Sequence, residues 1–223
     1  KLEEDLDVLL FDRRGHRAQL TEAGRELLDE GRQLLRAAGE LECRVKRVAT
    51  GWETELRIAV DTIIAVPRLF PLIDAFYAEG SGTRIRITSE VLGGTWDALA
   101  GNRCDLALGT SGDTPPGGGY TVKLLGWRDH VYAVASTHPL ASASGPLTRE
   151  QILAHRAVAV GDSSRSLAPR SVGLLSGQDV LTVPDLASKV EAQLAGLGAG
   201  YLPAAIAVPL ANVGRLVIKE TQE

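Results

Sequence analysis

A row of apolar or small residues runs through the first fifty positions with alternating steps of four and three. Its members are Leu27, Gly31, Leu34, Ala38, Leu41, Val45 and Val48. This spacing is a heptad seam, which predicts a long helix with one face that needs a partner. Thr21 can cap the helix and Glu22 suits its first turn, so the helix is expected over residues 21–50.

The partner of this seam could be a second copy of the chain or the chain's own domain. A dimer would use the larger members of the row, which are Leu27, Leu34, Leu41, Val45 and Val48. Leu28 and Leu35 widen the apolar stripe, and a wider stripe also suits packing within one globular domain. Soluble oligomers are mostly two-fold dimers, which favours a second copy of the chain as the partner.

A basic tip lies between two short apolar segments before this helix. Residues 1–6 resemble the end of a helix, and residues 8–11 and 18–20 predict two strands of a hairpin. Arg13, Arg14 and Arg17 sit at the tip, where guanidinium groups could contact phosphates or enter a narrow minor groove. The alternative is a solvated, charged turn without a partner.

After residue 51 short apolar runs alternate with helical segments. Strands are expected at 56–60, 84–91, 104–108, 122–125, 131–135, 157–160, 180–183 and 216–218. Helices are expected at 63–77, 95–100, 148–153, 185–197 and 204–210. The alternation predicts an α/β fold with βαβ units and mainly parallel sheets. It occurs twice, so we expect two lobes, at 51–127 with the returning segment 204–223, and at 128–203.

The composition of the chain limits which partners and which cellular compartment suit it. It has 223 residues and a net charge of −4, so any contact with nucleic acid must come from a local basic patch. No apolar run is long enough to span a membrane. Two cysteines, Cys43 and Cys104, make no disulfide framework, which suits the cytoplasm. The first residue is Lys, so we expect that an upstream segment is missing.

Three motifs at the front follow one another in a specific order. They are Lys1-Leu2-Glu3-Glu4-Asp5-Leu6, Leu10-Phe11-Asp12-Arg13-Arg14 and Leu20-Thr21-Glu22-Ala23-Gly24. The succession resembles the LysR-type transcriptional regulators. Weaker matches continue to the end of the chain, at Cys104-Asp105-Leu106-Ala107-Leu108, His138-Pro139-Leu140-Ala141 and Gly198-Ala199-Gly200-Tyr201-Leu202-Pro203.

The resemblance implies a winged helix-turn-helix domain, a linker helix and an effector domain. The effector domain would have two Rossmann-like lobes of the type 2 periplasmic-binding-protein kind. Residues 1–20 would be the remnant of the DNA-binding domain, without most of the recognition helix, and residues 21–50 the linker helix. The whole protein would act on DNA as a homodimer or homotetramer, controlled by a small-molecule effector.

Candidate effector-binding residues follow the expected strands, because ligands of open α/β sheets bind beyond the carboxyl ends of strands. They are Thr62, Gly94, Thr95, Trp96, Thr110, Ser163, Ser164, Arg165, Asp185 and Tyr201. The resemblance places the family's pocket at these strand ends and favours the three threonines.

The chemistry of this set suits a small organic anion. Arg165 could hold a carboxylate with two hydrogen bonds, and Trp96 could form an apolar wall. The other interpretations stay open. Thr62, Thr95 and Asp185 could be ordinary helix caps, residues 163–165 a surface loop, and Trp96 a core residue.

The sequence gives no indication of catalysis, of a cofactor or of a metal. The histidines, at positions 16, 130, 138 and 155, lack zinc-like spacing, and no P-loop or Gly-x-Ser-x-Gly motif is present. We therefore expect a regulator and no enzyme; the alternative is a two-lobed solute-binding protein without DNA function. Whether Cys43 or Cys104 has a redox role stays open, since inert thiols are the default.

Overall fold

The computed structural model describes residues 1–13, 18–115 and 118–222. The chain divides into two compact units. One comprises Lys1–Glu55 and Glu79–Arg84, and the other Leu56–Ala78 and Ile85–Glu223. None of the helices in the described ranges has the length and apolarity needed to cross a membrane.

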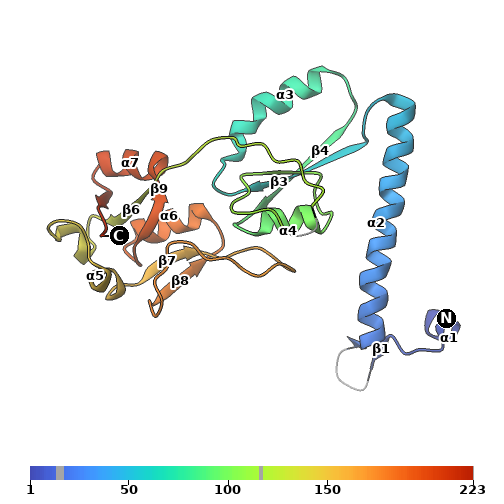
Figure 1. The fold of residues 1–223 in the computed structure, drawn as a ribbon, viewed down its shortest axis with the longest axis horizontal. Helices are drawn as coiled ribbons and strands as arrows, with labels where there is room; N and C mark the ends of the chain where they lie inside the picture. Colours follow the sequence, from blue (N-terminus) through green and yellow to red (C-terminus); the bar gives the residue numbers. More distant parts are fainter. Residues whose placement is uncertain (14–17, 116–117, 223) are drawn as a thin grey trace. The chain divides into compact units, whose positions relative to one another are not determined.

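The first unit contains a hairpin followed by one long helix (Figure 1). Its elements are α1 (Leu2–Leu6), β1 (Phe11–Asp12), β2 (Gln19–Leu20) and α2 (Glu22–Thr50). Strands β1 and β2 are antiparallel, with Phe11 opposite Leu20. The helix and hairpin lie where the sequence predicted them. Arg14 and Arg17 of the expected basic tip lie outside the described residues.

Hydrogen bonds from side chains hold the hairpin against the start of α2. Thr21 Oγ1 donates to Leu9 O at 2.7 Å and accepts from Gly24 N at 2.9 Å, so Thr21 is the predicted cap. Glu3 Oε1 accepts from the backbone N–H groups of Leu10 and Phe11, and these bonds hold the pKa of Glu3 below its ordinary value. A Cβ on Gly24 would overlap the carbonyl of Leu10, so this position requires glycine.

The large residues of the heptad seam are exposed along α2. Leu27 is 37% exposed, Leu34 is 72% exposed and Val48 is 87% exposed; Leu41 and Val45 lie between these values. Added Cβ atoms on Gly31 and Gly39 would meet none of the described atoms within 4 Å. An apolar stripe of this length without cover indicates a surface that another helix can bury.

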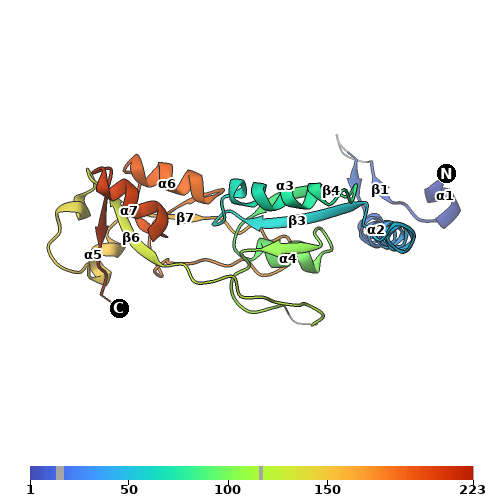
Figure 2. The ribbon, with the colours of Figure 1, turned by 90° about the horizontal axis from the view of Figure 1, so that it is seen from above.

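The first lobe of the second unit is a three-stranded sheet between helices (Figure 2). Its elements are β3 (Glu55–Asp61), η1 (Val66–Leu69), α3 (Phe70–Ala78), β4 (Arg84–Glu90), α4 (Gly94–Ala100) and β5 (Leu106–Leu108). The strand order is β4-β3-β5, and β3 is parallel to β5. Helix α3 covers one face of the sheet and α4 the other.

Cys104 belongs to the core of this lobe, with Ala59 and Ala98. It is 3% exposed, and its burial raises the pKa of the thiol, which disfavours the reactive thiolate. The side chain of Cys43 lies outside the described side chains.

The second lobe has an antiparallel part and a parallel part. Its elements are β6 (His130–Ala135), η2 (Pro139–Ser142), α5 (Arg149–Leu153), β7 (Ala157–Val160), β8 (Val180–Val183), α6 (Leu186–Leu194), β9 (Gly200–Pro203), α7 (Ala204–Asn212) and β10 (Leu216–Lys219). Strand β6 pairs antiparallel with β10 and β9, and β7 is parallel to β8. A bridge between Ala157 and Ala199 connects the two parts.

The expectation that residues 204–223 return to the first lobe is wrong. Strand β10 pairs with β6 of the second lobe, with Leu216 opposite Ala135. Leu216 and Ala207 then join Ala133 and Leu202 in the core beneath α6. The expected strand at 122–125 is not formed, and residues 200–203, between two expected helices, form strand β9, which was not predicted. The sheet of the second lobe is accordingly less parallel than predicted.

We expect Gly24→Ala to loosen the hairpin from α2, because the new Cβ overlaps the carbonyl of Leu10. Overpacking of this kind costs about 1–3 kcal/mol. Hydrogen–deuterium exchange over residues 8–24 should become faster. Gly39→Ala is the control, since it adds the same methyl group where nothing lies within 4 Å. Equal exchange in both variants would contradict the close approach.

Candidate ligand-binding site

Asp61 connects the two strand ends at the centre of the first lobe. Its carboxylate accepts from Ile63 N and from Leu92 N, both at 2.8 Å, and so fixes the turns after β3 and β4. Thr62 N donates to Glu90 O at 3.0 Å between the same two strands. Burial raises the pKa of Asp61 more than these hydrogen bonds lower it, and nearby Asp162 adds to the rise.

The loop after β7 of the second lobe contacts these strand ends. Ser163 Oγ donates to Glu90 Oε2 at 2.5 Å and accepts from Val91 N at 2.9 Å. Asp162 Oδ2 accepts from Gly93 N at 3.1 Å and from Arg170 N at 2.7 Å. Burial opposes the charge on Asp162, but hydrogen bonds from Ser164, Arg170 and Gly93 outweigh it and lower the pKa. The two lobes therefore meet through polar contacts.

A second connection runs through Asp97 of α4. Asp97 Oδ1 accepts from Ser166 N at 2.8 Å and from Leu167 N at 2.9 Å. Its Oδ2 pairs with Arg103 at 2.7 Å, and Arg103 also reaches Glu90 at 3.1 Å. Burial alone would raise the pKa of Asp97, but the backbone hydrogen bonds and Arg103 lower it. The carboxylate thus holds the loop after β7 in a fixed conformation.

Five predicted residues lie at or beside this meeting point: Thr62, Gly94, Thr110, Ser163 and Ser164. A Cβ on Gly94 would overlap Ser163 Oγ, so the backbone and the serine approach closely there. Ser164 N donates to Asp162 Oδ1 at 2.7 Å. Thr110 follows Gly109, where an added Cβ would lie 3.0 Å from Asp61 Cβ.

Thr95 and Trp96 are buried within the first lobe. Thr95 is 0% exposed, and its hydroxyl donates to Leu92 O at 3.1 Å. Trp96 is 3% exposed, its Nε1 donates to Ser111 O at 3.2 Å, and its ring meets Tyr120 edge-on. Both residues therefore pack inside the first lobe and hold the backbone at Leu92 and Ser111 through hydrogen bonds.

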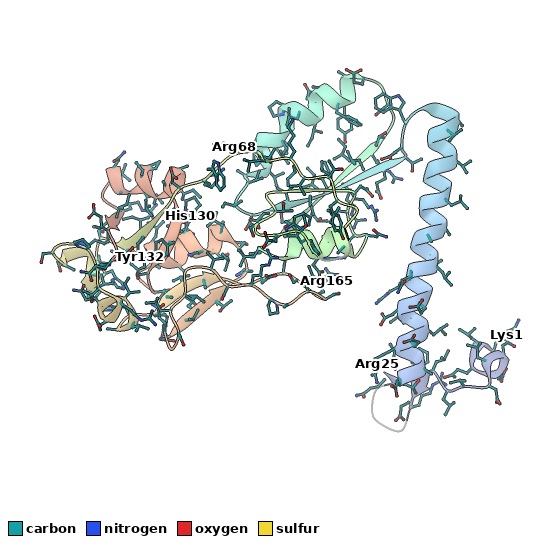
Figure 3. The ribbon with its side chains drawn as sticks, in the orientation of Figure 1. Lys1, Arg25, Arg68, His130, Tyr132 and Arg165 are labelled. Atoms are coloured by element: carbon teal, nitrogen blue, oxygen red, sulfur yellow. The ribbon has the colours of Figure 1, made fainter. Side chains whose placement is uncertain are left out.

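The remaining predicted residues lie elsewhere. Asp185 caps α6 by accepting from Ser188 N at 2.7 Å. Tyr201 packs edge-on against Tyr132 inside the second lobe, and its hydroxyl is 3.0 Å from Thr221 Oγ1. Arg165 is exposed on the loop after β7, next to the residues that bind Asp97 (Figure 3).

Sequence reasoning missed the charged residues that organise the site. Asp61 and Asp162 lie at or just after the ends of β3 and β7, so the strand-end argument pointed to their neighbours. Glu90 and Arg103 carried no signal, because their pairing depends on the sheet order. The carboxylates of Asp61, Glu90 and Asp162 all accept hydrogen bonds, either from backbone N–H groups or from Ser163 and Arg103. Within the described ranges, no three His, Cys, Asp or Glu residues gather as metal ligands.

Comparisons with known proteins identify relatives over almost the whole chain. A family model described as the LysR substrate binding domain matches residues 49–223. The HTH-type transcriptional regulator YeeY of Escherichia coli K12 is 42% identical over 220 residues, covering 99% of this chain and 71% of YeeY.

Solved structures share the fold. Full-length CbnR in complex with its target DNA has a TM-score of 0.56 at 18% identity, covering 100% of this chain and 76% of CbnR. Effector-bound LysG of Corynebacterium glutamicum has a TM-score of 0.55 at 23% identity, covering 97% of this chain and 73% of LysG.

We expect Asp97→Asn to destabilise the protein by about 2–4 kcal/mol at neutral pH, because it leaves Arg103 with one partner fewer. The folded pKa of Asp97 lies below 3.8, so its contribution is present above that pH and is lost as the pH falls further. Denaturant unfolding at several pH values should show a shallower loss below pH 4 in the variant. Asp74→Asn, at an exposed position of α3, is the control. Equal effects would show that Asp97 does not hold the loop.

Proposed function

Since the chain belongs to the LysR family of transcriptional regulators, we propose that a small organic anion binds where its two lobes meet and acts as the effector. LysR regulators bind DNA and small-molecule effectors and form oligomers. The curated relatives are named as transcriptional regulators, which favours regulation over catalysis or solute transport.

The contact between Ser163 and Glu90 is the observation that carries this proposal. It joins the loop after β7 to the carboxyl end of β4 across the two lobes. A ligand that enters between these loops competes with their polar contacts and prefers one lobe arrangement over another. Such a preference is what allosteric control requires.

An exposed cation beside the strand ends favours an anion as the ligand. Asp61, Asp97 and Asp162 accept hydrogen bonds from the protein's own N–H groups, so they offer little to a cationic ligand. Arg165 is exposed, and no carboxylate of the described residues forms an ion pair with it. Its guanidinium can bind a carboxylate with two hydrogen bonds. Thr62, Thr110, Ser163 and Ser164, with the backbone of Gly94, are proposed to complete the site.

We also propose that α2 forms the dimer interface through Leu27, Leu34, Leu41, Val45 and Val48. All five are exposed in the single chain, and a partner helix would bury them. Arg13, whose side chain is 73% exposed, would contact the DNA backbone together with Arg14 and Arg17. We propose that the whole protein acts on DNA in the cytoplasm.

The dimer interface can be tested with Leu41→Glu. We expect the added charge in the seam to weaken association at least tenfold, because a carboxylate in an apolar helix interface is desolvated. Gln33→Glu adds the same group to another exposed position of α2. Sedimentation velocity over a range of concentrations should show a monomer only for Leu41→Glu. A wild-type chain that stays monomeric at high concentration would contradict the interface.

The effector site can be tested with Arg165→Ala after a thermal-shift screen of organic acids. A ligand that binds only the native state raises its melting temperature. Loss of one charge-assisted hydrogen bond costs about 1.5–3 kcal/mol, so the Kd should rise about ten- to hundredfold. Arg149→Ala, at an exposed position of α5, is the control for calorimetry. An unchanged affinity in Arg165→Ala would remove this residue from the site.

A further inference from the structure

Lys189 is a buried cation that the contacts described so far do not use. It lies in the first turns of α6 and is 7% exposed. Within the described ranges no carboxylate forms an ion pair with its ammonium group. Burial is the cause that lowers the pKa of Lys189 to about 8. Lysine is almost never fully buried unless it is paired, so this position calls for an anion.

Gln193 presents a second unsatisfied polar group beside it. It follows Lys189 by one helical turn, so both side chains lie on the same face of α6. Gln193 is 0% exposed, and neither its Nε2 nor its Oε1 has a hydrogen-bond partner among the described residues. A native protein rarely leaves both atoms of a buried amide unpaired.

The two side chains converge on Gly200 of β9. A Cβ on Gly200 would lie 3.1 Å from Gln193 Nε2 and 3.7 Å from Lys189 Cε. Glycine therefore lets the amide of Gln193 and the aliphatic stem of Lys189 pack closely against the backbone of β9. The apolar residues Leu186, Val190 and Leu194 fill the neighbouring face of α6 and pack against the core. Packing of α6 alone does not require a lysine or a glutamine.

Lys189 lies toward the end of the second lobe that meets the first, and Gln193 lies one helical turn farther along α6. Helix α6 begins at Asp185, two residues after β8 ends. Strand β7 is parallel to β8, and the loop after β7 carries Asp162 and Ser163 to the first lobe. Lys189 thus lies near the same strand ends as the site proposed above.

We propose that Lys189 is the cationic anchor for a carboxylate of the effector, and that Gln193 binds a hydrogen-bonding group on the neighbouring carbon. This assignment rests on the proposed function and names its ligand class. The ammonium group pairs with the carboxylate, while the amide of Gln193 can both donate and accept. A hydroxyl or amine next to the carboxylate matches that amide, so the ligand is a 2-hydroxy or 2-amino acid.

The experiment is a thermal-shift and calorimetry panel on this chain. The panel contains lactate, malate, mandelate, alanine and phenylalanine. Propionate, succinate and phenylacetate are the matching acids without the hydroxyl or amine, and lactamide and mandelamide are the uncharged counterparts. We expect an acid to raise the melting temperature of the wild type while its amide does not. Lys189→Met should weaken that acid at least tenfold, and Gln193→Leu should erase the preference over the acid without the hydroxyl or amine. Lys123→Met, at an exposed lysine, is the matched control.

The outcomes separate this assignment from the proposed function. If an acid binds wild type and Lys189→Met equally but binds Arg165→Ala weakly, the effector site stands and the Lys189 anchor is wrong. If no member of the panel stabilises the wild type, the ligand class is wrong. In that case a wider screen of organic anions decides the proposed function separately.

A second measurement needs no ligand. The folded pKa of Lys189 lies near 8 and the unfolded value near 10.5, so the unfolded chain binds more protons between these values. Stability of the wild type should therefore rise from pH 8 to 10.5, and this rise should be absent in Lys189→Met. Titratable groups on α6 and on the strands beside it are Asp185, Glu191, His130, Tyr132 and Tyr201. The variant should also melt several degrees higher at neutral pH, which shows that it folds; an unchanged pH profile would contradict an unpaired Lys189.

Discussion

Buried carboxylates that accept hydrogen bonds from backbone N–H groups determine the shape of the junction between the two lobes. Asp61 holds the turns after β3 and β4, and Asp97 and Asp162 hold the loop after β7. A buried N–H group without a partner costs about 1–3 kcal/mol, so each carboxylate makes one loop conformation strongly preferred. The sheets supply the strand ends, but these acids decide where the loops between them lie.

The two lobes are joined by hydrogen bonds between these loops, and such bonds allow the lobes to rearrange when a ligand binds. Polar contacts such as Ser163 with Glu90 can be exchanged for contacts with a ligand or water at a small net change in free energy. An apolar interface of the same extent would resist opening, because its surface would have to be exposed to water. A regulator that must change its lobe arrangement when a metabolite arrives therefore benefits from a polar junction.

Local patterns in the sequence predicted the elements well, and pairing between distant elements poorly. The heptad seam predicted α2, and Thr21 was identified as its cap. The run at 216–218 was recognised as a strand, but nothing in three apolar residues specifies that Leu216 lies opposite Ala135. Residues 200–203 were not predicted as a strand, but they form β9, where Gly200 lets Gln193 pack closely against the backbone. The strand-end argument found Ser163 and Thr62 but gave no means of pairing Glu90 with Arg103.

The distribution of charge explains why an anion would act on the lobe arrangement as a whole. The first lobe contributes Asp61, Glu90 and Asp97 to the junction, so it repels an anion except where Arg103 and backbone N–H groups neutralise these acids. The second lobe contributes Lys189 and Arg165. The organic anion proposed above would therefore bind the second lobe first, and its uncharged part would be left to contact the first lobe. Contacts between the ligand and the first lobe form only when the two lobes are close together. Their binding free energy would therefore favour the lobe arrangement in which the ligand touches both lobes.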